Sequence, residues 1–189
     1  RPLRSVVTCM EPHPYMALGA PYGSGADPFC LRQGVRSRLL AAQVHLQGIT
    51  RGAGLQPLRF GIFDAWRPVS VQSFMVSHAI EQECARQGID PEDSEQLNRL
   101  ESVRSEVARF WAPPSSDFSI PPPHSTGAAV DLTLIDAKGN PLDMGGEIDA
   151  IGPESFPLHH ADAALNHPDG TAALFHSRRC LLHHVMTQA

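Results

Sequence analysis

The chain has 189 residues, of which 42% are hydrophobic and 19% are charged, and its net charge is −5 at pH 7. This length suits one globular domain, so we expect a single domain over residues 1–189. The acidic balance argues against a nucleic-acid partner, because nucleic-acid-binding domains carry a basic surface that neutralises phosphates. No apolar run reaches the roughly 18 residues that a membrane-spanning helix needs. The first ten residues contain no apolar core of signal-peptide length. The sequence therefore predicts a cytoplasmic protein without a membrane partner.

Residues 10–34 are rich in glycine and proline, which predicts an ordered loop or an extended arm. Apolar residues then recur at helical spacing and predict a helix over about residues 33–47. The short apolar run LRFGIF at 58–63 favours a core strand that continues into Asp64-Ala65-Trp66-Arg67-Pro68. Because proline is tolerated in the first turn of a helix, a second helix is expected over about 69–87.

A third helix is expected to begin at Ser94, which is a suitable N-cap residue, and to end before Pro113-Pro114. The proline-rich stretch 113–123 cannot be helical. Residues 129–135 alternate in polarity and predict a strand with Asp131 and Thr133 on its polar face.

Asp-Ala-Lys-Gly-Asn at 136–140 is typical of a hairpin turn. Residues 145–168 show no clear period, and apolar spacing predicts a last helix from about Thr171. Helices without βαβ alternation around a few strands indicate an α+β fold, with helices packed around a small, mostly antiparallel sheet.

The sequence from His124 to Asp131, HSTGAAVD, contains two candidate metal ligands. His124 lies in a loop, a glycine follows that lets the backbone turn closely, and Asp131 falls on the polar face of the predicted strand. Imidazole and carboxylate groups are common ligands of Zn²⁺, and a strand holds a ligand more rigidly than a loop does. A loop histidine and a hydrogen-bonded strand aspartate without any metal remain the alternative on these residues alone.

Arg67 is the second candidate, at the end of the predicted core strand. Pro68 restricts the backbone after it, so the guanidinium group would be well placed to stabilise a developing oxyanion. A structural salt bridge between Arg67 and a buried carboxylate is the alternative.

The order and spacing of these motifs resemble the D-alanyl-D-alanine dipeptidases, the VanX-type members of the zinc DD-peptidase superfamily. The matching pieces are DAWRP at 64–68, HSTGAAVDLTL at 124–134, DMGGEID at 143–149, the His159-His160 pair, and SRRCLLHHVM at 177–186. The resemblance implies a zinc DD-peptidase-like α+β fold with His124 and Asp131 as two of three protein ligands to Zn²⁺. It implies that Arg67 stabilises the tetrahedral oxyanion and that Asp149 pairs with the free amino group of a small D,D-dipeptide.

The implied activity is hydrolysis of D-Ala-D-Ala to two D-alanine molecules by metal-activated water. The third ligand and the catalytic glutamate of the family follow the last helix, beyond Ala189, so we expect the natural chain to continue and the present one to be inactive. Pro122 and Pro123 also stand where many members have serines. Two alternatives remain, a D,D-carboxypeptidase that acts on peptidoglycan stems and a non-catalytic binding domain of the same fold.

Overall fold

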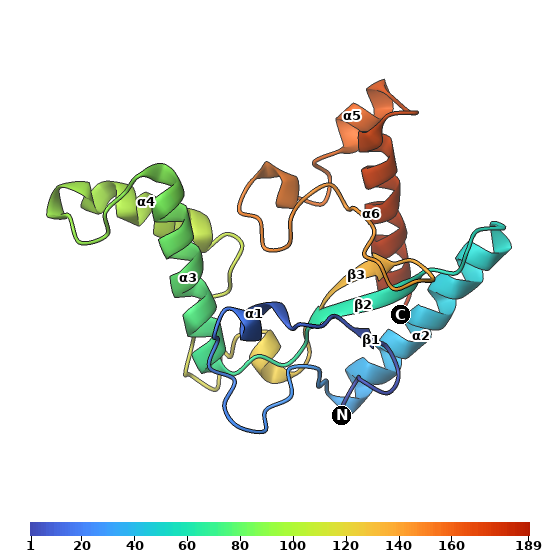
Figure 1. Cartoon of the computed structure of the whole chain (residues 1–189), viewed down its shortest axis with the longest axis horizontal. Helices are drawn as coiled ribbons and strands as arrows, with labels where there is room; N and C mark the ends of the chain where they lie inside the picture. Colours follow the sequence, from blue (N-terminus) through green and yellow to red (C-terminus); the bar gives the residue numbers. More distant parts are fainter. The chain divides into compact units, whose positions relative to one another are not determined.

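A computed structural model describes all residues from Arg1 to Ala189, and the chain divides into two compact units. The first unit comprises residues 1–10, 29–63 and 131–189, and the second comprises residues 11–28 and 64–130. Helices and a small sheet make up the chain, as the α+β prediction requires (Figure 1). None of the helices has both the length and the apolar character needed to cross a membrane.

A three-stranded sheet lies in the first unit, with the strand order β1-β2-β3. The strands are β1 (Thr8–Cys9), β2 (Arg59–Asp64) and β3 (Asp131–Ile135). β1 pairs with β2 in parallel and places Thr8 opposite Gly61, and the three-stranded sheet as a whole is mixed. Gly61 is required in this register, because a Cβ atom there would lie 2.7 Å from the Ile135 side chain.

The predicted hairpin follows β3. The Asp136 N–H donates to the Asn140 carbonyl at 2.9 Å, and Ile135 forms an antiparallel bridge with Pro141. The expected alternation of β3 is only partly present, because Thr133 is buried like its apolar neighbours. β3 contacts the C-terminal helix α6 (Thr171–Thr187) as well as its neighbouring strand β2. The contact with α6 explains part of the burial of β3.

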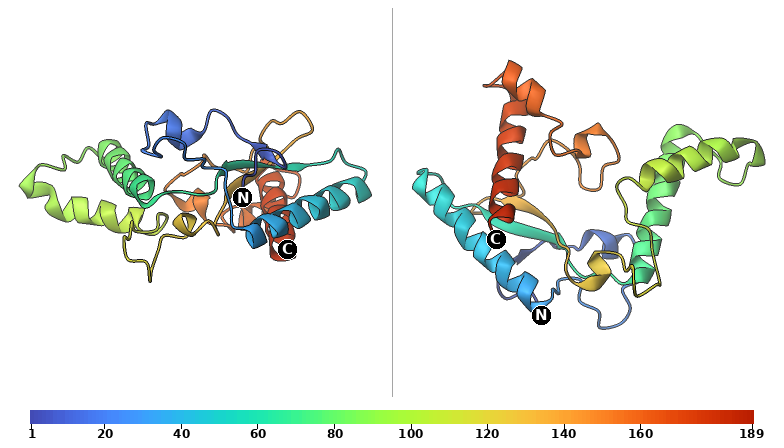
Figure 2. Two further views of the ribbon diagram at one scale, coloured as in Figure 1. Left: turned by 90° about the horizontal axis from the view of Figure 1, so that it is seen from below. Right: turned by 180° about the vertical axis from the view of Figure 1, so that it is seen from behind.

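The other helices of the first unit are α2 (Gln33–Gly52), α5 (Ala161–Asn166) and the short 3₁₀ helix η3 (Pro153–Ser155). α6 contacts α2 and α5 as well as β3, and two further views show its C-terminal end beside the strands (Figure 2). Leu46, Ile62, Leu134 and Val185 are fully buried in this unit. Each such side chain contributes about 1.5–3 kcal/mol through loss of contact with water.

The second unit contains α1 (Pro14–Ala17), α3 (Val69–Gln87), η1 (Ser94–Gln96), α4 (Leu97–Val107) and η2 (His124–Thr126). α3 packs against α4, and Val71, Met75, Leu100 and Val103 are buried. α3 has the predicted bounds, and it ends because Gly88 adopts the left-handed conformation at φ 63°.

The structure differs from the prediction in several details. The helix predicted over about residues 33–47 is α2, which extends to Gly52. Ser94 is not the N-cap, because the Asp93 carboxylate lies one residue earlier and accepts the Glu95 N–H at 2.9 Å. α4 ends at Val107, before Pro113-Pro114 as expected, and the chain continues in turns to Trp111. The arm at 10–34 contains the single-turn helix α1, whose N-cap His13 accepts the Met16 N–H through Nδ1.

Candidate functional site

The segment after β2 is held rigidly in the second unit. The main-chain N–H groups of Ala65 and Trp66 both donate to the Pro28 carbonyl, at 3.1 and 2.8 Å. Pro68 follows with ψ 152° and serves as the N-cap of α3. Arg67 therefore has little backbone freedom between these two attachments.

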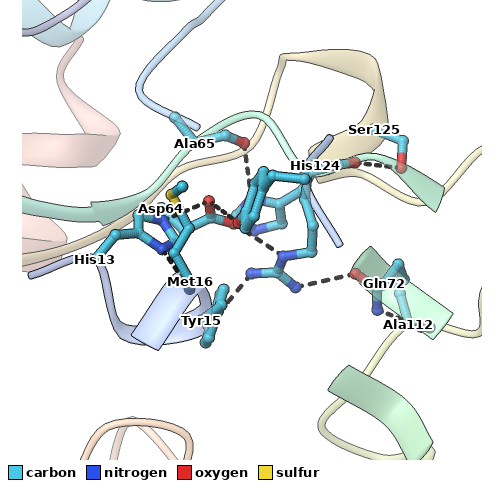
Figure 3. A network of polar contacts seen from close by, with 11 residues as sticks. His13, Tyr15, Met16, Asp64, Ala65, Gln72, Ala112, His124 and Ser125 are labelled. Atoms are coloured by element: carbon cyan, nitrogen blue, oxygen red, sulfur yellow. Dashed lines mark hydrogen bonds and ion pairs between the residues drawn. The ribbon is translucent and has the colours of Figure 1, made fainter. Parts of the chain in front are cut away.

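Asp64 is completely buried, and both of its carboxylate oxygens accept hydrogen bonds (Figure 3). Oδ2 accepts from the Arg67 Nε at 2.9 Å, and Oδ1 accepts from the Tyr22 hydroxyl at 2.8 Å. The His13 Nε2 lies 3.2 Å from Oδ1, and since its Nδ1 accepts the Met16 N–H, Nε2 carries the proton and donates. Three donors thus compensate the loss of water around this carboxylate.

Arg67 is only 3% exposed, and its whole guanidinium group is fixed in place. Nη1 donates to the Gln72 side-chain oxygen at 2.9 Å, and Nη2 donates to the Tyr15 hydroxyl at 3.3 Å. Cζ lies 4.8 Å from the centroid of the Tyr15 ring and 5.2 Å from that of the Trp111 ring, which is cation–π geometry. The salt bridge that the sequence left open is present, and its partner is Asp64. A guanidinium group held in advance in this way needs little reorganisation when charge develops nearby.

His124 begins the 3₁₀ turn η2, which Gly127 closes in the left-handed conformation at φ 69°. The His124 Nδ1 lies 2.9 Å from the Ala65 carbonyl oxygen. A carbonyl oxygen can only accept, so Nδ1 carries the hydrogen and the neutral ring keeps its lone pair on Nε2. Metal-binding histidines usually have this arrangement, in which one nitrogen donates to a carbonyl and the other binds the metal.

Main-chain contacts join the DAWRP and HSTG motifs directly. The Arg67 N–H donates to the His124 carbonyl at 3.4 Å, and the Ser125 hydroxyl donates to the Arg67 carbonyl at 2.8 Å. Together with the bond from the His124 ring to Ala65, these contacts hold both motifs as one local assembly (Figure 3). Almost sixty positions separate the two motifs in the sequence, so the tertiary fold brings them together.

Asp64, His124 and Asp131 each offer one ligand atom, and the three atoms lie within 4.8 Å of one another. Asp64 is the least suitable ligand of the three, because its oxygens already accept three hydrogen bonds. Its Oδ2 also lies 3.7 Å from the His124 Nδ1, the nitrogen that faces Ala65. Asp131 is half-buried and begins β3. The cluster thus contains one imidazole and two carboxylates, and His124 and Asp131 remain its candidate metal ligands.

Asp149 lies in the first unit, in an exposed turn. Its φ of 59° is in the left-handed region, which residues other than glycine seldom adopt. Such conformations often occur at functional positions.

Five buried partners of this site were not identified from the sequence: His13, Tyr15, Tyr22, Gln72 and Trp111. His13 is buried, and its ring bonds to the Asp64 carboxylate and to the Met16 N–H. His13, Tyr15 and Tyr22 all lie in the glycine- and proline-rich arm. Their closeness in the sequence is the one signal that could have indicated a role for the arm beyond that of a connecting loop.

Residues 25–189 match the Peptidase_M15 family, described as D-Ala-D-Ala dipeptidase. A D-alanyl-D-alanine dipeptidase from Synechocystis sp. (strain ATCC 27184 / PCC 6803 / Kazusa) is 40% identical over 166 residues. The alignment covers 85% of this chain and 62% of that protein, so the chain spans less than two thirds of the relative's length. No solved structure matches the chain. The family match includes most of both compact units, and the chain belongs to Peptidase_M15, a family of metallopeptidases.

Proposed function

We propose that the protein is a zinc-dependent dipeptidase that hydrolyses D-Ala-D-Ala to two D-alanine molecules. The family description and the name of the relative both support this substrate. The observation that carries the metal part of the proposal is the bond between the His124 Nδ1 and the Ala65 carbonyl, because it prepares Nε2 as a ligand.

His124 and Asp131 would hold the metal, and their chemistry fits zinc, which binds imidazole nitrogen and carboxylate oxygen. When bound, zinc supplies Lewis-acid chemistry that polarises a carbonyl group and acidifies water. A catalytic zinc site ordinarily has three protein ligands. Neither a third ligand nor a general base is assigned to a residue of this chain.

In this proposal Arg67 stabilises the negative charge that develops on the carbonyl oxygen of the scissile bond. Asp64, Gln72 and Tyr15 hold the guanidinium group in one orientation, so its electrostatic contribution is preorganised. Asp149 pairs with the free amino group of the dipeptide. A carboxylate in that role disfavours substrates whose amino group is acylated, since the acylated nitrogen has no charge to pair with it.

Release of D-alanine from D-Ala-D-Ala by the purified full-length protein, before and after removal of metal, tests the proposal. We expect hydrolysis that is lost on chelation and restored by zinc. His124→Ala should abolish both the activity and stoichiometric zinc binding, whereas His183→Ala, which changes an exposed histidine, should leave both unchanged. Metal-independent hydrolysis, or undiminished zinc content in His124→Ala, would refute the assignment. Faster hydrolysis of N-acetyl-D-Ala-D-Ala than of the free dipeptide would favour a D,D-carboxypeptidase.

A further inference from the structure

The Arg179 side chain on α6 connects the two ends of the segment 146–155 in the first unit. At the first end its Nε donates to the Met144 carbonyl at 2.7 Å, and Nη2 donates to the Gly145 carbonyl at 3.2 Å. At the second end its Nη1 donates to the Phe156 carbonyl at 3.0 Å. One guanidinium group therefore holds both ends of a ten-residue loop, and only an arginine has donors arranged as a fork for this purpose.

A second group fixes the first end of the loop. The His160 Nε2 lies 2.9 Å from the Gly145 carbonyl oxygen, so that oxygen accepts from His160 as well as from Arg179. Gly145 has φ 78°, and a Cβ atom there would collide with the His160 ring and with the Phe175 ring. Position 145 therefore accommodates glycine but no residue with a Cβ atom, unless its neighbours move. The predicted motifs at 143–149, 159–160 and 177–186 meet at this one carbonyl group.

The loop that Arg179 closes carries Asp149, the residue that we assign to the amino group of the substrate. Within the loop, the Ser155 hydroxyl donates to the Ala150 carbonyl next to Asp149. Asp149 is exposed, and an exposed ion pair contributes little unless its geometry is fixed. Joining the ends of a flexible loop costs conformational entropy, and the three bonds from Arg179 offset that cost before any substrate arrives.

We propose that Arg179 is a positioning residue that determines the preference of the enzyme for a free amino group, by holding the Asp149 loop in its binding conformation. This inference rests on the proposed function. Arg179 touches no substrate atom in this role and acts only through the loop. Its removal should weaken recognition of the ammonium group much more than it slows the bond-breaking step.

Two measurements on the full-length protein test this role, with Arg179→Ala compared with Arg178→Ala. Arg178 is the matched control, because it is the neighbouring arginine on α6 and its Nη1 donates to the Asp143 carbonyl, on one side of the loop only. The first measurement is hydrogen exchange of peptides within 146–155. We expect much faster exchange there in Arg179→Ala and little change in Arg178→Ala.

The second measurement is the ratio of kcat/KM for D-Ala-D-Ala to that for N-acetyl-D-Ala-D-Ala. In Arg179→Ala this ratio should fall by about tenfold to a hundredfold, mainly through KM for the free dipeptide, as for other losses of positioning far from the chemistry. Arg179→Lys should behave similarly, because one ammonium group cannot reproduce the three hydrogen bonds of the guanidinium group. This variant replaces Arg179→Ala in both measurements if the alanine variant does not fold.

Unchanged exchange in both Arg179 variants, or an unchanged ratio in a folded variant, would overturn the inference. These outcomes differ from failure of the proposed function, in which the unsubstituted protein hydrolyses neither substrate. If the unsubstituted protein hydrolyses neither substrate, faster exchange in Arg179→Ala would still show that Arg179 holds the loop at 146–155. The role of Arg179 in substrate selectivity would then be rejected.

Discussion

The central ion pair of the site provides a quantitative prediction. Asp64→Asn replaces a completely buried carboxylate that accepts from Arg67, Tyr22 and His13. An asparagine amide has one oxygen and one NH₂ group, so one of the former acceptor positions would become a donor facing a donor. Arg67 would also lose its counter-ion while remaining 3% exposed. Removal of one partner from a buried ion pair costs about 3–5 kcal/mol, so we expect the free energy of unfolding to fall by that amount.

Urea denaturation of the variants measures this loss. Glu106→Gln is the matched control, because Glu106 also pairs with an arginine three residues away, at 2.8 Å, but the two side chains are 39% and 54% exposed. Exposed pairs contribute at most about 1 kcal/mol. Tyr22→Phe, which removes one hydrogen bond and keeps the charge, should cost about 1.5–3 kcal/mol. An Asp64→Asn variant within 1 kcal/mol of the unsubstituted protein would refute the reasoning, as would equal losses for Asp64→Asn and Glu106→Gln.

Three other substitutions test separate parts of the structure. Ser125→Ala removes the hydroxyl that joins the two motifs, and calorimetry should show a loss of about 0.5–1.5 kcal/mol in unfolding free energy; no loss would mean that this bond is unimportant. Gly145→Ala combines a positive φ with a steric collision, so we expect a loss of about 1–3 kcal/mol together with faster proteolysis of the loop at 146–155, and a variant as resistant as the parent would contradict this. The hydrogen bond from the Asn140 side chain holds the pKa of Asp136 below its usual value. The lowered pKa of Asp136 therefore stabilises the fold above the unfolded pKa, about 3.9, and this stabilisation is lost as the pH falls through the folded pKa. Asp136→Asn should make the free energy of unfolding less dependent on pH in acid. An unfolding free energy with the same pH profile in variant and parent would disprove the contribution.

The sequence predicted well those helix ends that neighbouring residues such as proline and glycine determine. The helix at 69–87 was predicted with correct bounds, because Pro68 precedes it and Gly88 ends it in the left-handed conformation. The helical segment begins at Ser94 as the 3₁₀ turn η1, but its N-cap is Asp93, an equally good capping residue that stands immediately before it. Adjacent capping residues cannot be distinguished by type alone.

The partners of Arg67 could not be predicted in the same way. Tyr15 lies 52 positions from Arg67, and His13 and Tyr22 lie 51 and 42 positions from Asp64. No local period or turn signal connects residues at such separations; the tertiary fold alone brings them together. The HSTG and DAWRP motifs each stood out in the sequence, and a resemblance to a family linked them. The contacts between them show that they form one local assembly.

The central claim is that His124 and Asp131 bind one zinc ion, with His124 contributing Nε2. A crystal structure of the zinc-loaded full-length protein, with anomalous data collected at the zinc absorption edge, tests it most directly. We predict one strong peak at about 2.0–2.2 Å from both the His124 Nε2 and an Asp131 carboxylate oxygen, with the His124 Nδ1 still bonded to the Ala65 carbonyl. A peak on Nδ1, or zinc bound elsewhere while these two side chains hold no shared ion, would contradict the account.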